Sequence, residues 1–250
     1  MNGISWHRDG GVLRIVLDRP DKLNAVNTPM LKELKARVND GHDESVRVVV
    51  LTGAGRAFCS GGDLTGADTD GAVVAANEMV QAIAGLPKPV VAGVHGAAVG
   101  LGCSLALACD LVVAARSAFF QLAFTKVGLM PDGGASALVP VAIGRARAAR
   151  MAILAEKIPA ATAFEWGMIS HVVDDESYDT ELATVVQALA SGPTMSYGWL
   201  KRALSEATLS ALPTVSRLEV EGQTALTRTA DFLEGVRAFV KRRSPKFQGR

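Results

Sequence analysis

Residues 46–52 read VRVVVLT, a nearly unbroken run of β-branched and apolar residues. Such a run is typical of a strand buried on both faces, as in parallel sheets covered by helices on each side. Further apolar runs with the length of strands lie at 12–17, 90–95 and 111–114. Because parallel strands need long crossover connections, this pattern restricts the chain to an α/β architecture.

Helical segments are expected between these strands. Pro29 suits the first turn of a helix that runs to about Asp40. The stretch from Gly100 to Ala108 is small and apolar, which predicts a buried helix. The stretch from Thr65 to Gly71 (TGADTDG) has the composition of a loop, and we expect it to be mobile.

The second half of the chain has a different character. From Ala135 onward the periodicity is helical, apart from a short strand signal at 169–173. Gly192-Pro193 is a helix-breaking pair, and we place a boundary near residue 195. Residues 1–195 are thus expected to form the core, and residues 196–250 a separate helical region.

The composition narrows the class of protein. Of 250 residues, 49% are hydrophobic and 20% are charged, so the chain is able to build a sizeable core. The formal charge of +1 argues against a dedicated nucleic-acid binder, which needs a basic surface. No apolar run is long enough to span a membrane, and the first residues, MNGISWHRDGG, lack an apolar signal core. We therefore expect a cytoplasmic globular protein, either an enzyme or a small-molecule binder.

Three cysteines, Cys59, Cys103 and Cys109, form no CxxC pair, and the four histidines are scattered. An odd number of cysteines in a chain of this length does not indicate a disulfide framework. The spacing also predicts no metal site. We interpret Cys59 and Cys103 as small packing residues.

Two glycine-rich segments carry the strongest chemical signal. They are 52–64 (TGAGRAFCSGGDL) and 94–110 (VHGAAVGLGCSLALACD), and each follows an expected buried strand. Glycines at strand ends let the backbone approach a ligand and leave N–H groups free to bind it. Two such loops on neighbouring strands would offer two donors to one oxygen, as in an oxyanion hole. For either segment alone, a tight turn with close helix packing is the simpler interpretation.

Other nucleotide and hydrolase motifs fit less well. No GxxxxGK[ST] segment is present, and the glycines at 100–102 lack the third glycine of a dinucleotide fingerprint. The segment Gly102 to Ala106 is a degenerate GxSxG elbow centred on Ser104, with Asp132 and His171 following in the order of α/β-hydrolases. Ala106 replaces the last glycine, so a serine hydrolase remains a minority hypothesis.

In family order, six segments of the chain resemble the crotonase (enoyl-CoA hydratase/isomerase) superfamily. The resemblance implies a spiral of ββα turns, a C-terminal helical region that forms trimers or dimers of trimers, and an acyl-CoA substrate that itself carries the coenzyme A, with no separate cofactor. The matching segments are LDRPDKLNAVN (17–27), VVVLTGAGRAFCSGGDL (48–64), KPVVAGVHGAAVGLGCSLALACDLVVA (88–114), FTKVGLMPDGGAS (124–136), GRARAARMAILAEKIPAATAFEWGMISHVV (144–173) and GVRAFVKRRSPKFQGR (235–250).

In this family two backbone N–H groups polarise the thioester carbonyl, and by position the resemblance assigns them to Ser60 and Leu101. The family's hydratases also use two glutamates, whose positions here hold Ser104 and Phe124. Neither side chain can exchange a carboxyl proton, so hydration by two glutamates is not expected.

Asp132 is the carboxylate that remains nearby. The resemblance to the phenylacetate-pathway isomerase branch, which has an aspartate in a PDxGG-type setting, implies that Asp132 is the single acid/base. The simpler interpretation is a helix N-cap, because aspartate is favoured there. The favoured hypothesis is an isomerase that converts a 3-enoyl to a 2-enoyl thioester. The alternatives are a hydratase that uses Asp132 and a water, and an acyl-CoA-binding protein without activity.

The resemblance also implies a coenzyme A site. The segment KLNA (22–25) matches the loop that meets adenosine and pantetheine, and the tail from Arg237 to Arg250 holds six basic residues and no acidic residue. Asp63 is expected to be mainly structural, bonding to loop amides. The residues that we expect at coenzyme A are Lys22, Leu23, Ala25, Ser60, Gly62, Asp63, Leu64, Phe239 and Arg242.

Overall fold

The structure is a computed structural model that describes residues 3–64 and 69–250. The loop expected at 65–71 lies partly outside the described residues. Helix α2 (Thr69–Gly85) already begins within that stretch, so the expected loop is too long at its C-terminal end.

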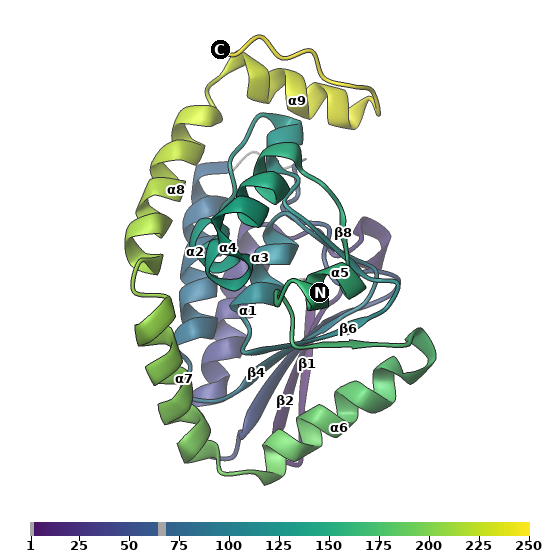
Figure 1. The fold of residues 1–250 in the computed structure, drawn as a ribbon, viewed down its shortest axis with the longest axis vertical. Coiled ribbons are helices and arrows are strands. Elements are labelled where there is room, and N and C mark those ends of the chain that lie inside the picture. The colour runs from purple at the N-terminus through teal and green to yellow at the C-terminus, as the bar shows by residue number, and fades with distance from the viewer. Residues whose placement is uncertain (1–2, 65–68) are drawn as a thin grey trace.

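A six-stranded sheet forms the centre of the fold (Figure 1). Its strand order is β1-β2-β3-β4-β6-β9; β1 and β2 are antiparallel, and all other neighbours are parallel. The expected α/β class and the four expected apolar strands are therefore confirmed. The bounds are β1 (Ile4–Asp9), β2 (Val12–Leu17), β3 (Val48–Gly53), β4 (Val90–Val94), β6 (Leu111–Ala115) and β9 (His171–Val173).

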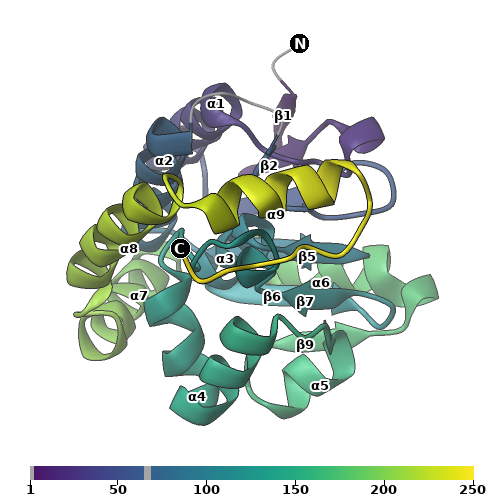
Figure 2. The same ribbon diagram turned by 90° about the horizontal axis from the view of Figure 1, so that it is seen from above.

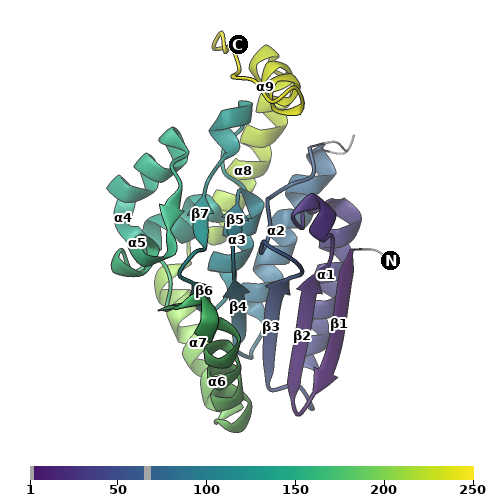
Figure 3. The same ribbon diagram turned by 90° about the vertical axis from the view of Figure 1, so that its right-hand side faces the viewer.

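A second, shorter layer of strands continues the first. It consists of β5 (Ala97–Val99), β7 (Phe119–Gln121) and β8 (Ile158–Pro159), in the order β5-β7-β8. Single parallel bridges, Cys59 with Ala98 and Val26 with Gly62, extend this layer toward the N-terminal part of the chain. Strands β4 and β6 thus each lead into a second short strand, β5 and β7, and the bridged segments at Val26 and Cys59 follow β2 and β3 in the same way, which gives the ββα spiral (Figure 3).

The valine run at 46–52 is buried on both sides of β3, as its composition predicts. Val49 and Leu51 belong to the large core, which lies under α1 (Thr28–Asn39), α2 and α3 (Leu101–Ala108). Val48 and Val50 face the opposite side, where they pack with α6 (Tyr178–Ser191). Helices therefore cover both faces of the sheet at this strand (Figure 1).

Local signals in the sequence set the start of α1. The Asn27 side chain accepts a hydrogen bond from the Met30 N–H at 3.1 Å, and a proline occupies the first helical turn. An asparagine N-cap followed by proline is a strong helix start because it satisfies or removes unpaired N–H groups. The helix expected from Pro29 to about Asp40 is confirmed.

Helices dominate after residue 134. They are α4 (Ala135–Leu154), α5 (Ala160–Glu165), α6, α7 (Thr194–Thr208), α8 (Leu212–Leu226) and α9 (Ala230–Val240), with short 3-10 helices η1 (Pro20–Lys22), η2 (Asp40–His42), η3 (Phe124–Val127) and η4 (Asp175–Ser177). Helices α7 and α8 run along one side of the sheet layers, and α9 crosses one end (Figures 1 and 2). Within the described ranges, no helix is both long and apolar enough to cross a membrane.

An ion pair between a buried lysine and a partly exposed aspartate fixes α7 to the sheet region. Lys201 Nζ lies 2.8 Å from the Asp110 carboxylate and donates to the Ile83 carbonyl at 2.8 Å. Helix α8 then continues over α2 and α4. Helices α7 and α8 thus pack directly on the core of the fold.

Candidate active site

The first glycine-rich loop is held on one side by β5. The Cys59 N–H donates to the Ala97 carbonyl, and the Val99 N–H donates to the Cys59 carbonyl, each at 2.9 Å. Gly102, in the first turn of α3, packs directly on Cys59, and a Cβ atom on Gly102 would overlap the Cys59 carbonyl. The small residues of the second glycine-rich segment thus let α3 approach the first loop closely.

The other side of the same loop is held by the segment around Val26. The Val26 N–H donates to the Gly61 carbonyl at 2.9 Å, and the Asp63 N–H donates to the Val26 carbonyl at 2.8 Å. Val26 is thus paired with Gly62, the residue between Gly61 and Asp63. In a parallel bridge of this kind, the N–H of the paired residue itself points away from the partner strand. The Gly62 N–H therefore points away from Val26, toward the side where α3 begins.

Two N–H groups remain free at this close approach. Gly61 adopts φ 104°, and a Cβ atom there would lie 2.9 Å from the Val99 carbonyl and 3.7 Å from the Leu101 nitrogen. The neighbouring Gly62 N–H and the Leu101 N–H have no acceptor among residues 3–64 and 69–250. Leu101 starts α3, where N–H groups have no partner within the helix and carry the positive end of the dipole.

The donor expected at Ser60 needs correction. The Ser60 N–H donates to the Leu23 carbonyl at 2.9 Å, and its hydroxyl donates to the Lys22 carbonyl at 3.2 Å. An N–H that already has a backbone acceptor is not available to a substrate oxygen. The free donor of this loop is two residues further on, at Gly62.

Asp132 lies in the turn between η3 and α4, and this turn packs against the first turn of α3. Its carbonyl accepts the Ser104 hydroxyl at 2.8 Å, and Gly133 packs against the side chains of Leu101 and Ser104. The carboxylate is buried; Oδ2 accepts a hydrogen bond from Gln223 at 3.0 Å, while Oδ1 has no protein partner in the described chain.

The environment of Asp132 favours its protonated form. Burial raises the pKa of Asp132 to about 7; the nearby negative charge of Glu219 adds to this effect, and the hydrogen bond from Gln223 opposes it. A carboxyl group with a pKa near neutrality is suited to both accepting and returning a proton.

The N-cap interpretation of Asp132 is wrong. Helix α4 begins at Ala135 with Gly134 at the N-cap position, and it has no cap from its own segment. Instead the N–H groups of Gly134 and Ser136 donate to the Glu219 carboxylate of α8, at 2.8 and 2.9 Å. Burial raises the pKa of Glu219, and these two hydrogen bonds oppose that effect. The Asp132 carboxylate is thus left without a capping role.

The structure does not support a serine hydrolase. The hydroxyl of the fully buried Ser104 donates to the Asp132 carbonyl. His171 lies on β9, and its Nδ1 contacts the Ser170 hydroxyl at 2.9 Å. Phe124 occupies the second of the two positions that the resemblance assigns to glutamate in the hydratases. Its ring lies next to Gly100, where a Cβ atom would be 3.8 Å from the ring.

The residues expected at the coenzyme A loop come together around one buried asparagine. Leu23 and Asn24 both have positive φ, 49° and 57°, and the Asn24 side-chain amide donates to the carbonyls of Ala54 and Ala57 at 2.8 and 2.7 Å. Lys22 is exposed and Ala25 half-buried in the same turn, which the Ser60 contacts tie to the first glycine-rich loop.

Asp63 is tied to a side chain rather than only to loop amides. Its carboxylate lies 3.1 Å from both terminal nitrogens of Arg19, which also donates to the Ala25 carbonyl at 2.9 Å. This ion pair supports the expected structural role of Asp63. Leu64 is the last residue described before the gap at 65–68.

Phe239 and Arg242 lie elsewhere, at the end of α9. Both line a surface cavity of about 750 Å³, whose wall also includes Lys126 and Leu154. Phe239 is 61% exposed. No hydrogen bond in the described parts of the chain joins these residues to the loop at 22–25.

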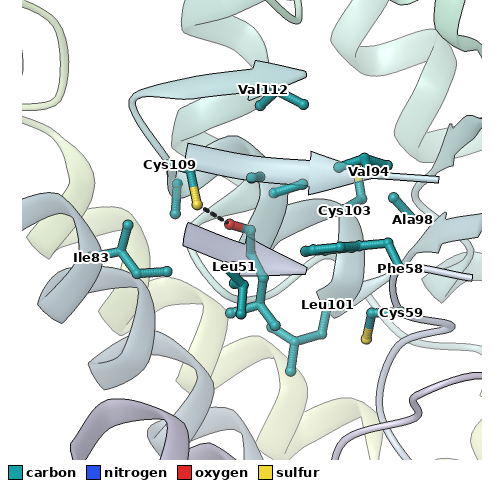
Figure 4. Close-up of a cluster of buried hydrophobic side chains, with 14 of the residues drawn as sticks. Leu51, Phe58, Cys59, Ile83, Val94, Ala98, Leu101, Cys103, Cys109 and Val112 are labelled. Atoms are coloured by element: carbon teal, nitrogen blue, oxygen red, sulfur yellow. Dashed lines mark hydrogen bonds between the residues drawn. The ribbon is translucent and has the colours of Figure 1, made fainter. Parts of the chain in front are cut away.

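The three cysteines are packing residues, as expected for Cys59 and Cys103. All are buried, and the pKa of Cys59 and of Cys103 is raised to about 12 by burial; that of Cys109 is also raised. They lie among Phe58, Val94 and other apolar side chains of the core (Figure 4). Their thiols are therefore not poised as nucleophiles.

Comparisons with known proteins agree with this architecture. Residues 7–250 match the family model described as enoyl-CoA hydratase/isomerase. A 1,2-epoxyphenylacetyl-CoA isomerase of Escherichia coli is 41% identical over 261 residues, covering both chains completely. A probable enoyl-CoA hydratase of Rhodobacter capsulatus is 43% identical, covering 99% of this chain and 98% of the relative.

The solved structures show the same fold. An enoyl-CoA hydratase from Mycobacterium avium subsp. paratuberculosis superposes with a TM-score of 0.95 and 43% identity, covering 98% of each chain. The chain belongs to the enoyl-CoA hydratase/isomerase family, and the expected spiral fold and enzyme class are confirmed.

The buried Asp132 makes stability depend on pH. An unfolded aspartate ionises near its ordinary pKa of 3.8, whereas folded Asp132 ionises near 7. The folded protein should therefore lose stability as pH rises through this window, by roughly 1.4 kcal/mol for each pH unit at most. We expect Asp132→Asn to remove this loss, so that the variant gains stability relative to wild type as pH rises from about 4 to about 7, with no further change above that range. Urea unfolding of both proteins across this range measures the difference in their free energies of unfolding. A difference that does not change with pH would contradict the raised pKa of Asp132.

Proposed function

We propose that the protein is an acyl-CoA isomerase that converts a 3-enoyl thioester to the conjugated 2-enoyl thioester. The observation that carries this proposal is the buried Asp132, whose pKa is near 7 and whose Oδ1 atom is unpaired, beside the free N–H groups at the start of α3. One group that exchanges a proton and a pair of oxyanion donors are what this reaction needs.

The proposed reaction moves one proton and gains or loses no other atom. Ionised Asp132 removes a proton from C2 through Oδ1, and the electron pair of that C–H bond moves onto the thioester oxygen to form a dienolate. The N–H groups of Gly62 and Leu101 bind that oxygen. When the electrons return, Asp132 delivers the proton to C4 and the double bond is left between C2 and C3.

Several features favour isomerisation over hydration. Addition of water by the family's usual route needs two carboxyl groups, and Ser104 and Phe124 supply none. Phe124 and Leu101 also make the site apolar, which strengthens the electrostatic effect of the two N–H donors. One highly similar relative carries the name of an isomerase and another that of a probable hydratase.

Coenzyme A binding is proposed at two groups of residues. The turn of Lys22, Leu23 and Ala25, together with the adjoining loop at Ser60, Gly62, Asp63 and Leu64, would hold the part nearest the thioester. Phe239 and Arg242 would meet the nucleotide end, where an aromatic face and a cation suit adenine and phosphate.

The direct test of the reaction uses the wild-type protein and Asp132→Asn. With a 3-enoyl-CoA, we expect wild type to form the conjugated 2-enoyl-CoA without a change in mass, as followed by ultraviolet absorbance and mass spectrometry. Asp132→Asn should lower kcat by about 10² to 10⁴, since it removes the acid/base, while coenzyme A affinity is unchanged. A gain of one water on a 2-enoyl-CoA would indicate a hydratase instead. Tight binding without turnover of either substrate would indicate a binding protein.

The N–H of Leu101 can be removed without removing the helix. Leu101 is the first helical residue of α3, a position where proline is tolerated because its N–H has no helical partner. Leu101→Pro should lower kcat by about 10² to 10³, as for loss of one oxyanion donor. The matched control is Leu101→Ala, which keeps the N–H and loses the same side-chain contacts. Equal kcat values for the two variants would exclude this donor.

We also propose that the protein forms trimers or dimers of trimers through α7 and α8. Exposed apolar side chains gather on these helices, at Met195, Trp199, Leu200, Leu204 and Leu218. Sedimentation velocity should show a particle of three or six times 26.1 kDa. Trp199→Glu should shift it toward the monomer, because burial of a charge without a partner is unfavourable. Trp6→Glu is the matched control on β1, and a monomeric wild type would exclude the assembly.

A further inference from the structure

The inward face of α8 is polar, although it lies against the protein interior. Ser216, Glu219 and Gln223 recur at spacings of three and four residues, so they share one helix face, and all are buried. Buried polar side chains are unfavourable unless they find partners. Two of these side chains, Glu219 and Gln223, find theirs on the turn that contains Asp132.

Gln223 binds this turn with both hydrogens of its amide. Nε2 donates to the Met130 carbonyl at 2.7 Å and to Oδ2 of Asp132 at 3.0 Å. A backbone carbonyl only accepts hydrogen bonds, so the amide nitrogen rather than the amide oxygen has to face the turn. The orientation of this amide is thus determined by Met130, independently of the state of Asp132.

The backbone of α8 is shaped for this contact. Gly222 precedes Gln223, and a Cβ atom there would overlap the sulfur of Met130. One helical turn earlier, Glu219 accepts the N–H groups of Gly134 and Ser136. Helix α8 therefore holds the turn on both sides of Asp132.

We propose that Gln223 is the positioning residue of Asp132: its amide occupies Oδ2 and leaves Oδ1 as the one oxygen that exchanges protons with the substrate. This inference deepens the isomerase function proposed above and rests on it for its catalytic meaning. The contact itself is a property of the folded chain and is measurable without substrate.

The charges around Asp132 fix the direction of the expected effect. Glu219 of α8 is the charged group in the described residues that acts on Asp132, and it favours the protonated acid. From α3 the facing side chains are Leu101 and Ser104, which are uncharged. Gln223 donates to the carboxylate and so favours the ionised base. Loss of this amide should raise the pKa of Asp132.

The test variant is Gln223→Met, which keeps the length and shape of the side chain and removes both N–H donors. Its matched control is Asn77→Leu, because the buried Asn77 amide also holds α8, through the Ser216 carbonyl at 3.0 Å, without touching the Asp132 turn. Both variants lose buried hydrogen bonds between α8 and the rest of the chain, so a general loss of stability should appear in both.

Two readouts separate positioning from stability. The protonated-carboxyl band of Asp132, identified by subtracting the infrared spectrum of Asp132→Asn, is titrated in each variant. In parallel, kcat/KM for a 3-enoyl-CoA is measured against pH. For Gln223→Met we expect both midpoints to move up by about one pH unit, kcat at pH 7 to fall by about tenfold or more, and KM to change by less than about twofold. Asn77→Leu should match wild type in all of these.

The outcomes are distinct. A shifted infrared midpoint together with a shifted rate profile supports the inference. A shifted infrared midpoint in a protein whose wild type converts no 3-enoyl-CoA keeps Gln223 as the partner of Asp132 and overturns the proposed function. Infrared midpoints that coincide in wild type, Gln223→Met and Asn77→Leu overturn the role of Gln223, whatever the activity.

Discussion

The close approach of the two glycine-rich loops is the constraint on which the rest of the site depends. Side chains larger than hydrogen at Gly61 and Gly102 would meet the backbone of the other loop, so the two segments touch through their main chains. This contact is possible because β3 and β4 are neighbours, and both deliver their loops to the same edge of the sheet. As a result, the free N–H groups of Gly62 and Leu101 lie at fixed points of a rigid framework, and no side chain has to be ordered to present them.

The second layer of organisation is electrostatic. Asp132 is buried between α3, which binds its backbone through Ser104, and α8, which binds its side chain through Gln223. Burial and Glu219 favour the protonated acid, while Gln223 favours the carboxylate, and the balance places the pKa of Asp132 near 7. A carboxyl group in that range exchanges protons at neutral pH without a second acid, which explains how the site could work without the two glutamates of the hydratases.

The sequence predicts the parts of this protein that depend on local patterns. The valine run of β3, the helix start at Pro29 and the glycine-rich turns after two strands each act through neighbours in sequence, and the elements they predict are present. Strand β1 was not expected, because its residues ISWHRD are mostly exposed and polar and so lack an apolar pattern. Strands β5, β7 and β8 are two or three residues long, too short for any periodicity to appear.

The candidate site was predictable only in part, because its decisive partners come from distant segments. The resemblance assigned one donor to Ser60, and only the pairing of the Ser60 N–H with the distant Leu23 carbonyl shows that the free N–H of this loop is at Gly62 instead. Glu219 and Gln223 lie about ninety residues beyond the turn they hold. Their polar, evenly spaced face on α8 was a usable signal, because a helix that buries such a face needs polar partners.

The most direct test of the central claim follows a labelled proton. A 3-enoyl-CoA that carries deuterium at C2 is incubated with the wild-type protein, and the position of the label in the 2-enoyl product is determined by nuclear magnetic resonance. If the buried Asp132 alone removes and returns the proton, part of the deuterium should appear at C4. A product in which C4 carries no deuterium after a single turnover, the one deuterium removed from C2 having passed entirely to solvent, would contradict transfer by one buried carboxyl group.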